Sequence, residues 1–186
     1  KSIKSDAIIF SDFRHGIFNK ISINQFLKEI YKKKRTIKIA DSQVASRWGN
    51  ICDFSNFDLI TPNEKEARFS LADQDSNISE LTRQLSKKAN FKNLILKLSS
   101  RGIFVVSKDK AFSLPSFVNH CIDPVGAGDA LLVGATFGML NTKSIEMASF
   151  IGSIFAACEC EINGNVALEK NVILKKIQTL QESLNF

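Results

Sequence analysis

The sequence lacks the features that mark secreted and membrane proteins. Four cysteines in 186 residues are too few and too irregularly spaced for a disulfide framework, so we expect reduced thiols and a cytoplasmic protein. No apolar run reaches the roughly 20 residues of a membrane span, because Gly134 and Gly138 interrupt even the apolar segment 130–140. The opening KSIKSDAIIF has neither the apolar core nor the cleavage site of a secretory signal. These absences predict a soluble, globular protein.

Patterns typical of metal and nucleic-acid binding are also missing. Cys158 and Cys160 are two residues apart, and such residues do not face each other on a helix, so burial is favoured over metal ligation. The net charge is +6, but its one dense run, residues 32–35, falls at the end of a predicted helix, where cations complement the helix dipole. A solvated helix end is therefore favoured, and we predict no nucleic-acid and no membrane partner. A basic balance also suits a phosphate-rich small ligand.

Apolar patterning predicts strands that alternate with helices. Short apolar runs that end in polar residues predict strands, and apolar residues at helical spacing predict the helices between them. The predicted strands cover residues 7–10, 36–40, 58–60 and 93–98, helices are predicted from Ser22, from Thr61-Pro62 and around Leu81, and nearly everything after Asp129 is predicted helical. Residues 103–117 predict short antiparallel strands with a hairpin tip at 108–110. We expect one α/β domain over residues 1–186.

Polar residues gather where the predicted strands end. In open α/β sheets, ligands bind outside the carboxyl ends of the strands. The residues at such positions are Asp12, Asp41, Asn63, Glu66 and Lys97. We expect them to line one crevice although they are far apart in the sequence.

The stretch DPVGAGDA, residues 123–130, places two glycines where an apolar helix begins. Glycine adopts positive φ and lets a ligand approach the backbone. The amides of Gly126, Ala127 and Gly128 at a helix N-terminus suit an anion, such as the charge that develops in phosphoryl transfer. Asp129 could accept the proton of an attacking hydroxyl. The alternative is a tight helix start in which Asp129 only complements the helix dipole.

Three motifs in this order, TPNEKEA (61–67), LKLSSRG (96–102) and DPVGAGDA (123–130), resemble the ribokinase-like sugar kinases of the phosphofructokinase-B type. The resemblance implies a three-layer α/β fold with a mainly parallel central sheet, and ATP-dependent phosphoryl transfer to a sugar or sugar-phosphate hydroxyl. It matches only the later part of a complete family member, without the N-terminal strands and lid. We expect either the C-terminal part of a longer kinase or a half-protein that pairs with another chain.

The resemblance also implies roles for single residues. Asp129 is the implied catalytic base, the amides of residues 126–128 hold the developing charge, and Asn63 and Glu66 match an Asn-x-x-Glu element that influences magnesium and phosphate binding. Helix capping is an equal alternative for those two. The implied nucleotide contacts are Lys97, Ser99, Gly102, Asp123 and Asn163. A plain β-turn at 99–102 and a glycine C-cap at Gly164 are the alternatives there, and the family often has glycine in place of Ser99.

The segment IIFSDFRHGI, residues 8–17, resembles a segment of heptose-phosphate kinases, with Phe13 for tyrosine and His15 for lysine. We interpret His15 as a surface histidine, and keep Asp12 and Arg14 as candidate substrate contacts. A heptose 7-phosphate is the leading substrate. The implied cofactors are ATP and Mg²⁺, with a monovalent cation in addition. The implied partners are ATP, a sugar or sugar phosphate, the N-terminal segment or partner chain, and a second copy in a homodimer.

Two functions of other classes compete with a kinase. A catalytically silent nucleotide-binding or assembly module would keep the glycine loop but have no acceptor site. A Rossmann dehydrogenase is disfavoured, because Gly126 and Gly128 lie far from the first predicted strand.

Overall fold

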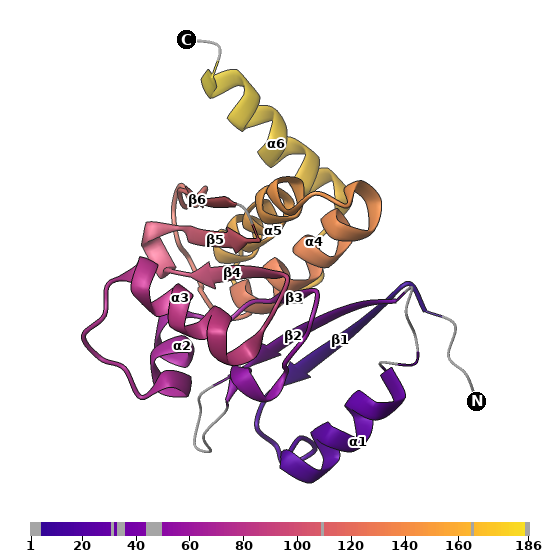
Figure 1. The fold of residues 1–186 in the computed structure, drawn as a ribbon. Coiled ribbons are helices and arrows are strands. Elements are labelled where there is room, and N and C mark those ends of the chain that lie inside the picture. The colour runs from indigo at the N-terminus through magenta and orange to yellow at the C-terminus, as the bar shows by residue number, and fades with distance from the viewer. Residues whose placement is uncertain are drawn as a thin grey trace. The chain divides into compact units, whose positions relative to one another are not determined.

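The computed structural model describes residues 5–30, 32, 36–43, 50–108, 110–164 and 166–184, and Figure 1 shows how its strands and helices are arranged. The strands are β1 (Ala7–Asp12), β2 (Ile37–Ser42), β3 (Leu59–Ile60), β4 (Asn93–Lys97), β5 (Ile103–Ser107) and β6 (Lys110–Leu114). The helices are α1 (Lys20–Ile30), α2 (Glu64–Leu71), α3 (Ile78–Ala89), α4 (Ala127–Thr142), α5 (Ile145–Cys160) and α6 (Lys170–Leu184), with short 3₁₀ helices η1 (Ile51–Asp53) and η2 (Ser99–Arg101). The strands and helices predicted from the sequence are therefore present.

The strands form one mixed, mostly parallel sheet in the order β1-β2-β3-β4-β5-β6. The first four strands are parallel, and their register aligns Phe10 with Ala40, Ala40 with Ile60, and Ile60 with Leu94. This register places four buried apolar side chains in one row across the sheet. β5 and β6 are neighbours separated by only two residues, a connection that antiparallel strands can make and parallel strands cannot.

Contacts divide the chain into two compact units. The first unit holds residues 1–98 and 104–113, and the second holds residues 99–103 and 114–186. The prediction of a single domain over residues 1–186 stays a prediction.

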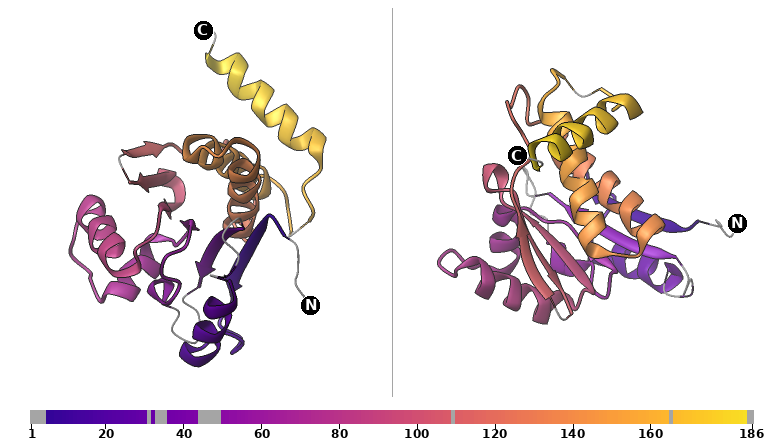
Figure 2. Two further views of the ribbon diagram at one scale, coloured as in Figure 1. Left: turned by 45° about the vertical axis from the view of Figure 1, so that its right-hand side comes forward. Right: turned by 90° about the horizontal axis from the view of Figure 1, so that it is seen from above.

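The core of the first unit joins α1, η1, α2 and α3 to one face of strands β1 to β4. In the view from above in Figure 2, α2 and α3 lie along the strands. Four phenylalanines of this core, Phe10, Phe18, Phe54 and Phe57, form a cluster of neighbouring rings, and the exposed Phe26 packs its ring against Phe10 and Phe18. The rings of Phe10 and Phe57 meet edge to face with centroids 5.5 Å apart, an arrangement that aromatic quadrupoles favour.

In the second unit, α4 and α5 pack closely side by side (Figure 2). Glycines permit this approach: a Cβ atom at Gly138 would lie 2.6 Å from the Cα of Ala148, and one at Gly134 would lie 2.8 Å from the Cγ of Phe155. The glycines that interrupt the apolar run are therefore contact points between two helices. Within the described residues, every helix is too short or too polar to cross a membrane.

Two predicted helix starts are wrong by a few residues. The side chain of Asn19, not Ser22, caps α1, because Asn19 Oδ1 accepts hydrogen bonds from the amides of Ile21 (2.9 Å) and Ser22 (3.0 Å). Ser22 lies inside the first turn, and its Oγ accepts a bond from the Asn19 amide. Similarly, α2 begins after Asn63, while Thr61 still follows β3.

The cysteine pair and the basic run, to which the sequence analysis gave no function, have structural surroundings that agree with this. Cys158 and Cys160 are buried, as predicted, and the described ranges contain no group of three or more potential metal ligands. Of the basic run, Lys32 is described and pairs with Glu29 at 2.7 Å, while residues 33–35 lie outside the described residues. The hairpin residue Asp109 also lies outside them.

Candidate active site

Polar side chains contact one another at the carboxyl ends of β1, β2 and β4. Ser42 Oγ donates a hydrogen bond of 3.1 Å to Asp12 Oδ2, which joins the ends of β1 and β2. Lys97 Nζ, at the end of β4, lies 3.2 Å and 3.1 Å from the two carboxylate oxygens of Asp41, at the end of β2. Asp12 and Asp41 are both buried, so each carboxylate needs these partners. The first unit therefore has a connected polar edge where ligands of open α/β sheets bind.

Asn63 and Glu66 extend this edge and form a capping box. Asn63 Oδ1 accepts a 2.8 Å hydrogen bond from the Glu66 amide, and Glu66 Oε2 accepts a 2.7 Å bond from the Asn63 amide. The backbone of Asn63 also pairs with that of Lys97. The capping alternative is thus observed, and it fixes two oxygen-bearing side chains beside Lys97. Their role toward magnesium stays a prediction.

Asp12 and Arg14, the predicted substrate contacts, bind each other after β1. Asp12 Oδ1 accepts from the Arg14 amide at 2.9 Å, and Asp12 Oδ2 accepts from Arg14 Nη1 at 2.6 Å. The Nε atom of Arg14 is buried and has no hydrogen-bond partner among the described residues. The neighbouring His15 is exposed and stacks on Phe13, consistent with a surface histidine. Asp12 therefore fixes the position of Arg14, whose Nε–H donor makes no hydrogen bond to another described residue.

The turn after β4 depends on two left-handed residues. Ser99 has φ 57° and Gly102 has φ 82°, and the Gly102 amide donates to the Ser99 carbonyl at 2.9 Å. A Cβ atom at Gly102 would lie 2.1 Å from the Leu114 carbonyl oxygen, so glycine is required there. Because Ser99 has positive φ, the family's frequent glycine at this position has a physical reason. The Ser99 side chain is exposed at the start of η2.

The DPVGAGDA motif forms the start of α4 in the second unit. Gly126 occupies the N-cap with φ 88°, and Asp129 lies in the first turn. Asp123 Oδ1 accepts a 3.0 Å hydrogen bond from the Val125 amide, so this carboxylate shapes the loop. The first amides of a helix have no acceptor within the helix, and here the cap residue has no side chain to supply one. The Ala127 amide donates to the Pro124 carbonyl at 3.3 Å, so an anion at this helix start would compete with Pro124 for that amide.

The C-terminal end of α5 holds the loop that leads into α4. The Cys160 carbonyl accepts hydrogen bonds from the amides of Ile122 (2.7 Å) and Asp123 (3.1 Å). Glu161 Oε1 accepts from the Asn119 amide and from Lys176 Nζ of α6, both at 2.6 Å. Sequence reasoning missed this role of Glu161 and Lys176, because no motif links positions 15 residues apart in different elements.

Asn163 is exposed in the turn after α5. The alternative of a glycine C-cap at Gly164 is wrong, because Glu161 is the residue that ends α5 and its amide bonds to Ala157 and Glu159. Gly164 has φ 81° in open space. Its conformation serves the turn, and the nucleotide contact at Asn163 stays a prediction.

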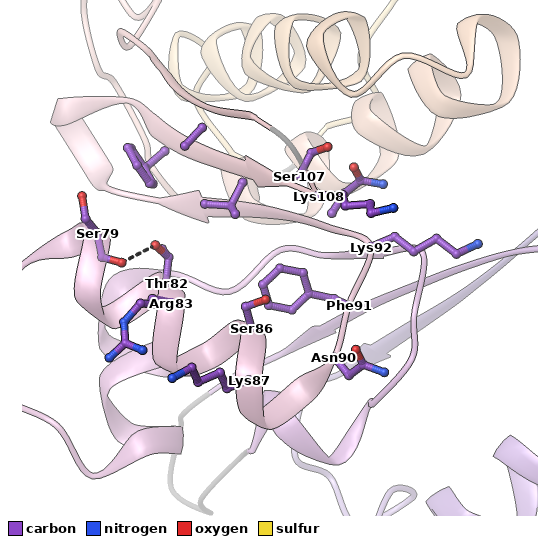
Figure 3. A pocket seen from close by; sticks show the side chains of 14 residues that line it. Ser79, Thr82, Arg83, Ser86, Lys87, Asn90, Phe91, Lys92, Ser107 and Lys108 are labelled. Atoms are coloured by element: carbon purple, nitrogen blue, oxygen red, sulfur yellow. Dashed lines mark hydrogen bonds between the residues drawn. The ribbon is translucent and has the colours of Figure 1, made fainter.

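A groove of about 820 Å³ lies elsewhere on the first unit, between α3, the start of β4 and the β5–β6 hairpin (Figure 3). Phe91 and Phe104 contribute apolar surface to it, and its cationic side chains are Arg83, Lys87, Lys92 and Lys108. The predicted site residues do not line this groove. It contains Asn93, the first residue of β4, whereas Lys97 ends the same strand. The groove is therefore separate from the polar carboxyl edge.

Comparison with known proteins agrees with the motifs. The family described as pfkB family carbohydrate kinase matches residues 20–170. The bifunctional protein HldE of Helicobacter acinonychis (strain Sheeba) is 25% identical over 190 residues, which cover 97% of this chain and 40% of HldE. Phosphofructokinase-2 of Escherichia coli, solved in complex with potassium, aligns with a TM-score of 0.78 and 16% identity over 94% of this chain and 57% of that one. Arabidopsis thaliana ribokinase, solved with ribose and ATP, aligns with a TM-score of 0.77 and 20% identity over 94% and 56%.

The likeness in structure defines the class first: this is a ribokinase-like α/β fold, as the motifs predicted. The chain belongs to the pfkB family of carbohydrate kinases, since the family match covers most of its length. It spans about 40% of the length of HldE and little more than half of the solved structures.

Proposed function

We propose that this chain carries the nucleotide-binding and phosphoryl-transfer part of an ATP-dependent carbohydrate kinase. The observation that supports this most is the start of α4, where Gly126 turns the backbone at φ 88° and Asp129 stands in the first turn. Helix amides and a carboxylate then lie together where an anion and a hydroxyl would meet. Family membership supports the same reaction.

The proposed reaction moves the γ-phosphoryl group of ATP to a sugar hydroxyl. The hydroxyl oxygen forms a bond to phosphorus while the bond to the ADP oxygen breaks, and Asp129 accepts the hydroxyl proton. The amides at residues 126–128 stabilise the negative charge on the transferred oxygens. Because helix amides are fixed before the reaction, they lose little energy in reorganising.

The polar edge of the first unit fits a hydrated magnesium ion. Magnesium prefers oxygen ligands and keeps several waters, so side chains that already cap a helix can contact it through water. Asn63 and Glu66 are the residues that would hold it in this way, and they lie beside the Lys97–Asp41 ion pair. When bound, the ion would neutralise phosphate charge. A monovalent cation is proposed in addition, because potassium is present in the structure of phosphofructokinase-2.

The proposed acceptor is a phosphorylated sugar, with a heptose 7-phosphate as the leading candidate. Support comes from the segment around Asp12 and Arg14, which resembles that of heptose-phosphate kinases. Arg14 is fixed by the Asp12 carboxylate and keeps a buried Nε donor, which suits an anionic group of the acceptor.

Calorimetric titration of this chain with ATP, in the presence and absence of Mg²⁺, tests the proposal. We expect binding that requires Mg²⁺, followed by ADP release when sugar phosphates are added together with the N-terminal segment of a relative. Absence of ATP binding by the folded chain would contradict the proposal. ATP binding without phosphoryl transfer to any acceptor would support the catalytically silent nucleotide-binding module instead. That alternative is consistent with a chain that covers only 40% of HldE and 57% of phosphofructokinase-2.

A further inference from the structure

Two cysteines meet where the loop that leads into α4 touches the end of α5. Cys121 immediately precedes Ile122, whose amide donates a 2.7 Å hydrogen bond to the carbonyl oxygen of Cys160. Standard backbone dimensions then hold the Cα atoms of Cys121 and Cys160 within about 7.5 Å of each other. Native disulfides usually join Cα atoms roughly 4.4–6.8 Å apart. The backbone therefore brings this pair to the edge of bonding range.

The side chains of the pair also face each other. The Cys121 side chain is close enough to the Cys160 thiol to be among the groups that raise its pKa. Cys121 is exposed, whereas Cys160 is buried, and both are reduced. A dissolved oxidant thus reaches Cys121 first, and Cys160 is the neighbouring thiol that can react with the product.

We propose that Cys121 and Cys160 form a reversible disulfide that fastens the loop before α4 to the end of α5. With hydrogen peroxide as the oxidant, the Cys121 sulfur attacks one peroxide oxygen, the O–O bond breaks, and a sulfenic acid and one water form. The Cys160 sulfur then attacks the sulfenic sulfur, loses its proton, and displaces the second water. Two thiols are oxidised by two electrons and the peroxide is reduced to two waters, and a dithiol reductant reverses the bond.

The surroundings make Cys160 the slower partner. Burial, helped by the neighbouring Cys121, Glu161 and Glu159, raises the pKa of the Cys160 thiol to about 11. Cys160 is therefore protonated at neutral pH, and the sulfenic acid on Cys121 persists before the disulfide closes.

Peptide mapping of the full chain tests the proposal directly. Trypsin releases Cys121 in residues 111–143, and both Cys158 and Cys160 in residues 144–170. After peroxide treatment and alkylation of the remaining thiols, we expect these peptides joined and lighter by two hydrogens, within a monomer, and separated by dithiothreitol. Cys160→Ser should abolish the link, whereas the matched control Cys158→Ser should retain it.

A cross-link that survives Cys160→Ser, or one that joins two chains, would overturn the proposal. A second contradicting result would come from the Cys158→Ser protein: after prolonged peroxide treatment, Cys121 would be oxidised while Cys160 would still be a free thiol that alkylates. Thermal unfolding gives a second readout that needs no variant: the tether should raise the Tm by roughly 5–10 °C, and reduction should reverse the rise. An unchanged Tm of the cross-linked protein would contradict a native-state bond.

Discussion

At the scale of single residues, left-handed backbone occurs at several of the predicted site residues, in each of the two units. Arg14 and Ser99 have positive φ although they carry side chains, and Gly102 and Gly126 have it as glycines. Such conformations cost energy for most L-residues and persist where the surrounding structure enforces them. The loops after β1 and β4 and before α4 are therefore held in particular shapes, which is what a site for a charged ligand requires.

Gly102 and Gly164 allow the effect of steric contact to be separated from that of backbone strain. Both have φ near 80°, but a Cβ atom would lie 2.1 Å from the Leu114 carbonyl oxygen at Gly102 and would meet open space at Gly164. We expect Gly164→Ala to lower the free energy of unfolding by about 1 kcal/mol, and Gly102→Ala by at least about 3 kcal/mol. Urea unfolding measures both, and equal losses would mean that the turn relaxes around the new methyl group.

Asp129 provides the residue-scale test of the proposed chemistry. Asp129→Asn keeps the shape of the side chain but removes the proton acceptor, so turnover should fall by roughly 10²-fold or more while MgATP affinity changes little. Glu146→Gln is the matched control, because Glu146 is also a first-turn carboxylate of a helix in the same unit. Initial rates of ADP release and calorimetry measure the two effects. Near-normal turnover of the Asp129 variant would remove its assignment as base.

The raised pKa of Cys160 predicts how disulfide closure depends on pH. Since the thiolate attacks and the pKa is about 11, the thiolate fraction increases with pH throughout the neutral range. Closure after the initial oxidation should accelerate by roughly 100-fold between pH 7 and 9. Acid quenching and alkylation at successive times give the rate, and a rate independent of pH would show that a different step limits closure.

At the scale of elements, variants of Glu66 test whether the capping box of α2 also contributes to magnesium binding. Glutamine can replace glutamate in a capping box, so Glu66→Gln keeps the bond to the Asn63 amide and removes only the charge. We expect a severalfold increase in the Mg²⁺ concentration for half-maximal activity, with unfolding free energy within about 0.5 kcal/mol of the original. Glu66→Ala, in comparison, should lose about 1 kcal/mol of stability. Unchanged magnesium dependence in the glutamine variant would leave capping as the role of Glu66.

At the scale of the whole molecule, local patterns predicted the elements better than the contacts between them. The apolar runs located the strands, and the three motifs indicated the family and the fold. The role of Asn19 as N-cap of α1 was not predicted, because Ser22, three residues away, is also a residue type that caps helices. The sequence placed Asp41 and Lys97 at the same edge of the sheet, but their ion pair, between residues 56 positions apart, also depends on strand order, which no local pattern determines.

One carboxylate oxygen of Glu161 accepts from both the Asn119 backbone and the Lys176 side chain. In evolutionary terms, the choice of amino acid is restricted at positions 161 and 176 but nearly free at position 119. Any residue except proline can supply the amide at 119, whereas a buried lysine at 176 needs an anionic neighbour. Positions 161 and 176 should therefore change together among descendants of this sequence, while position 119 drifts freely.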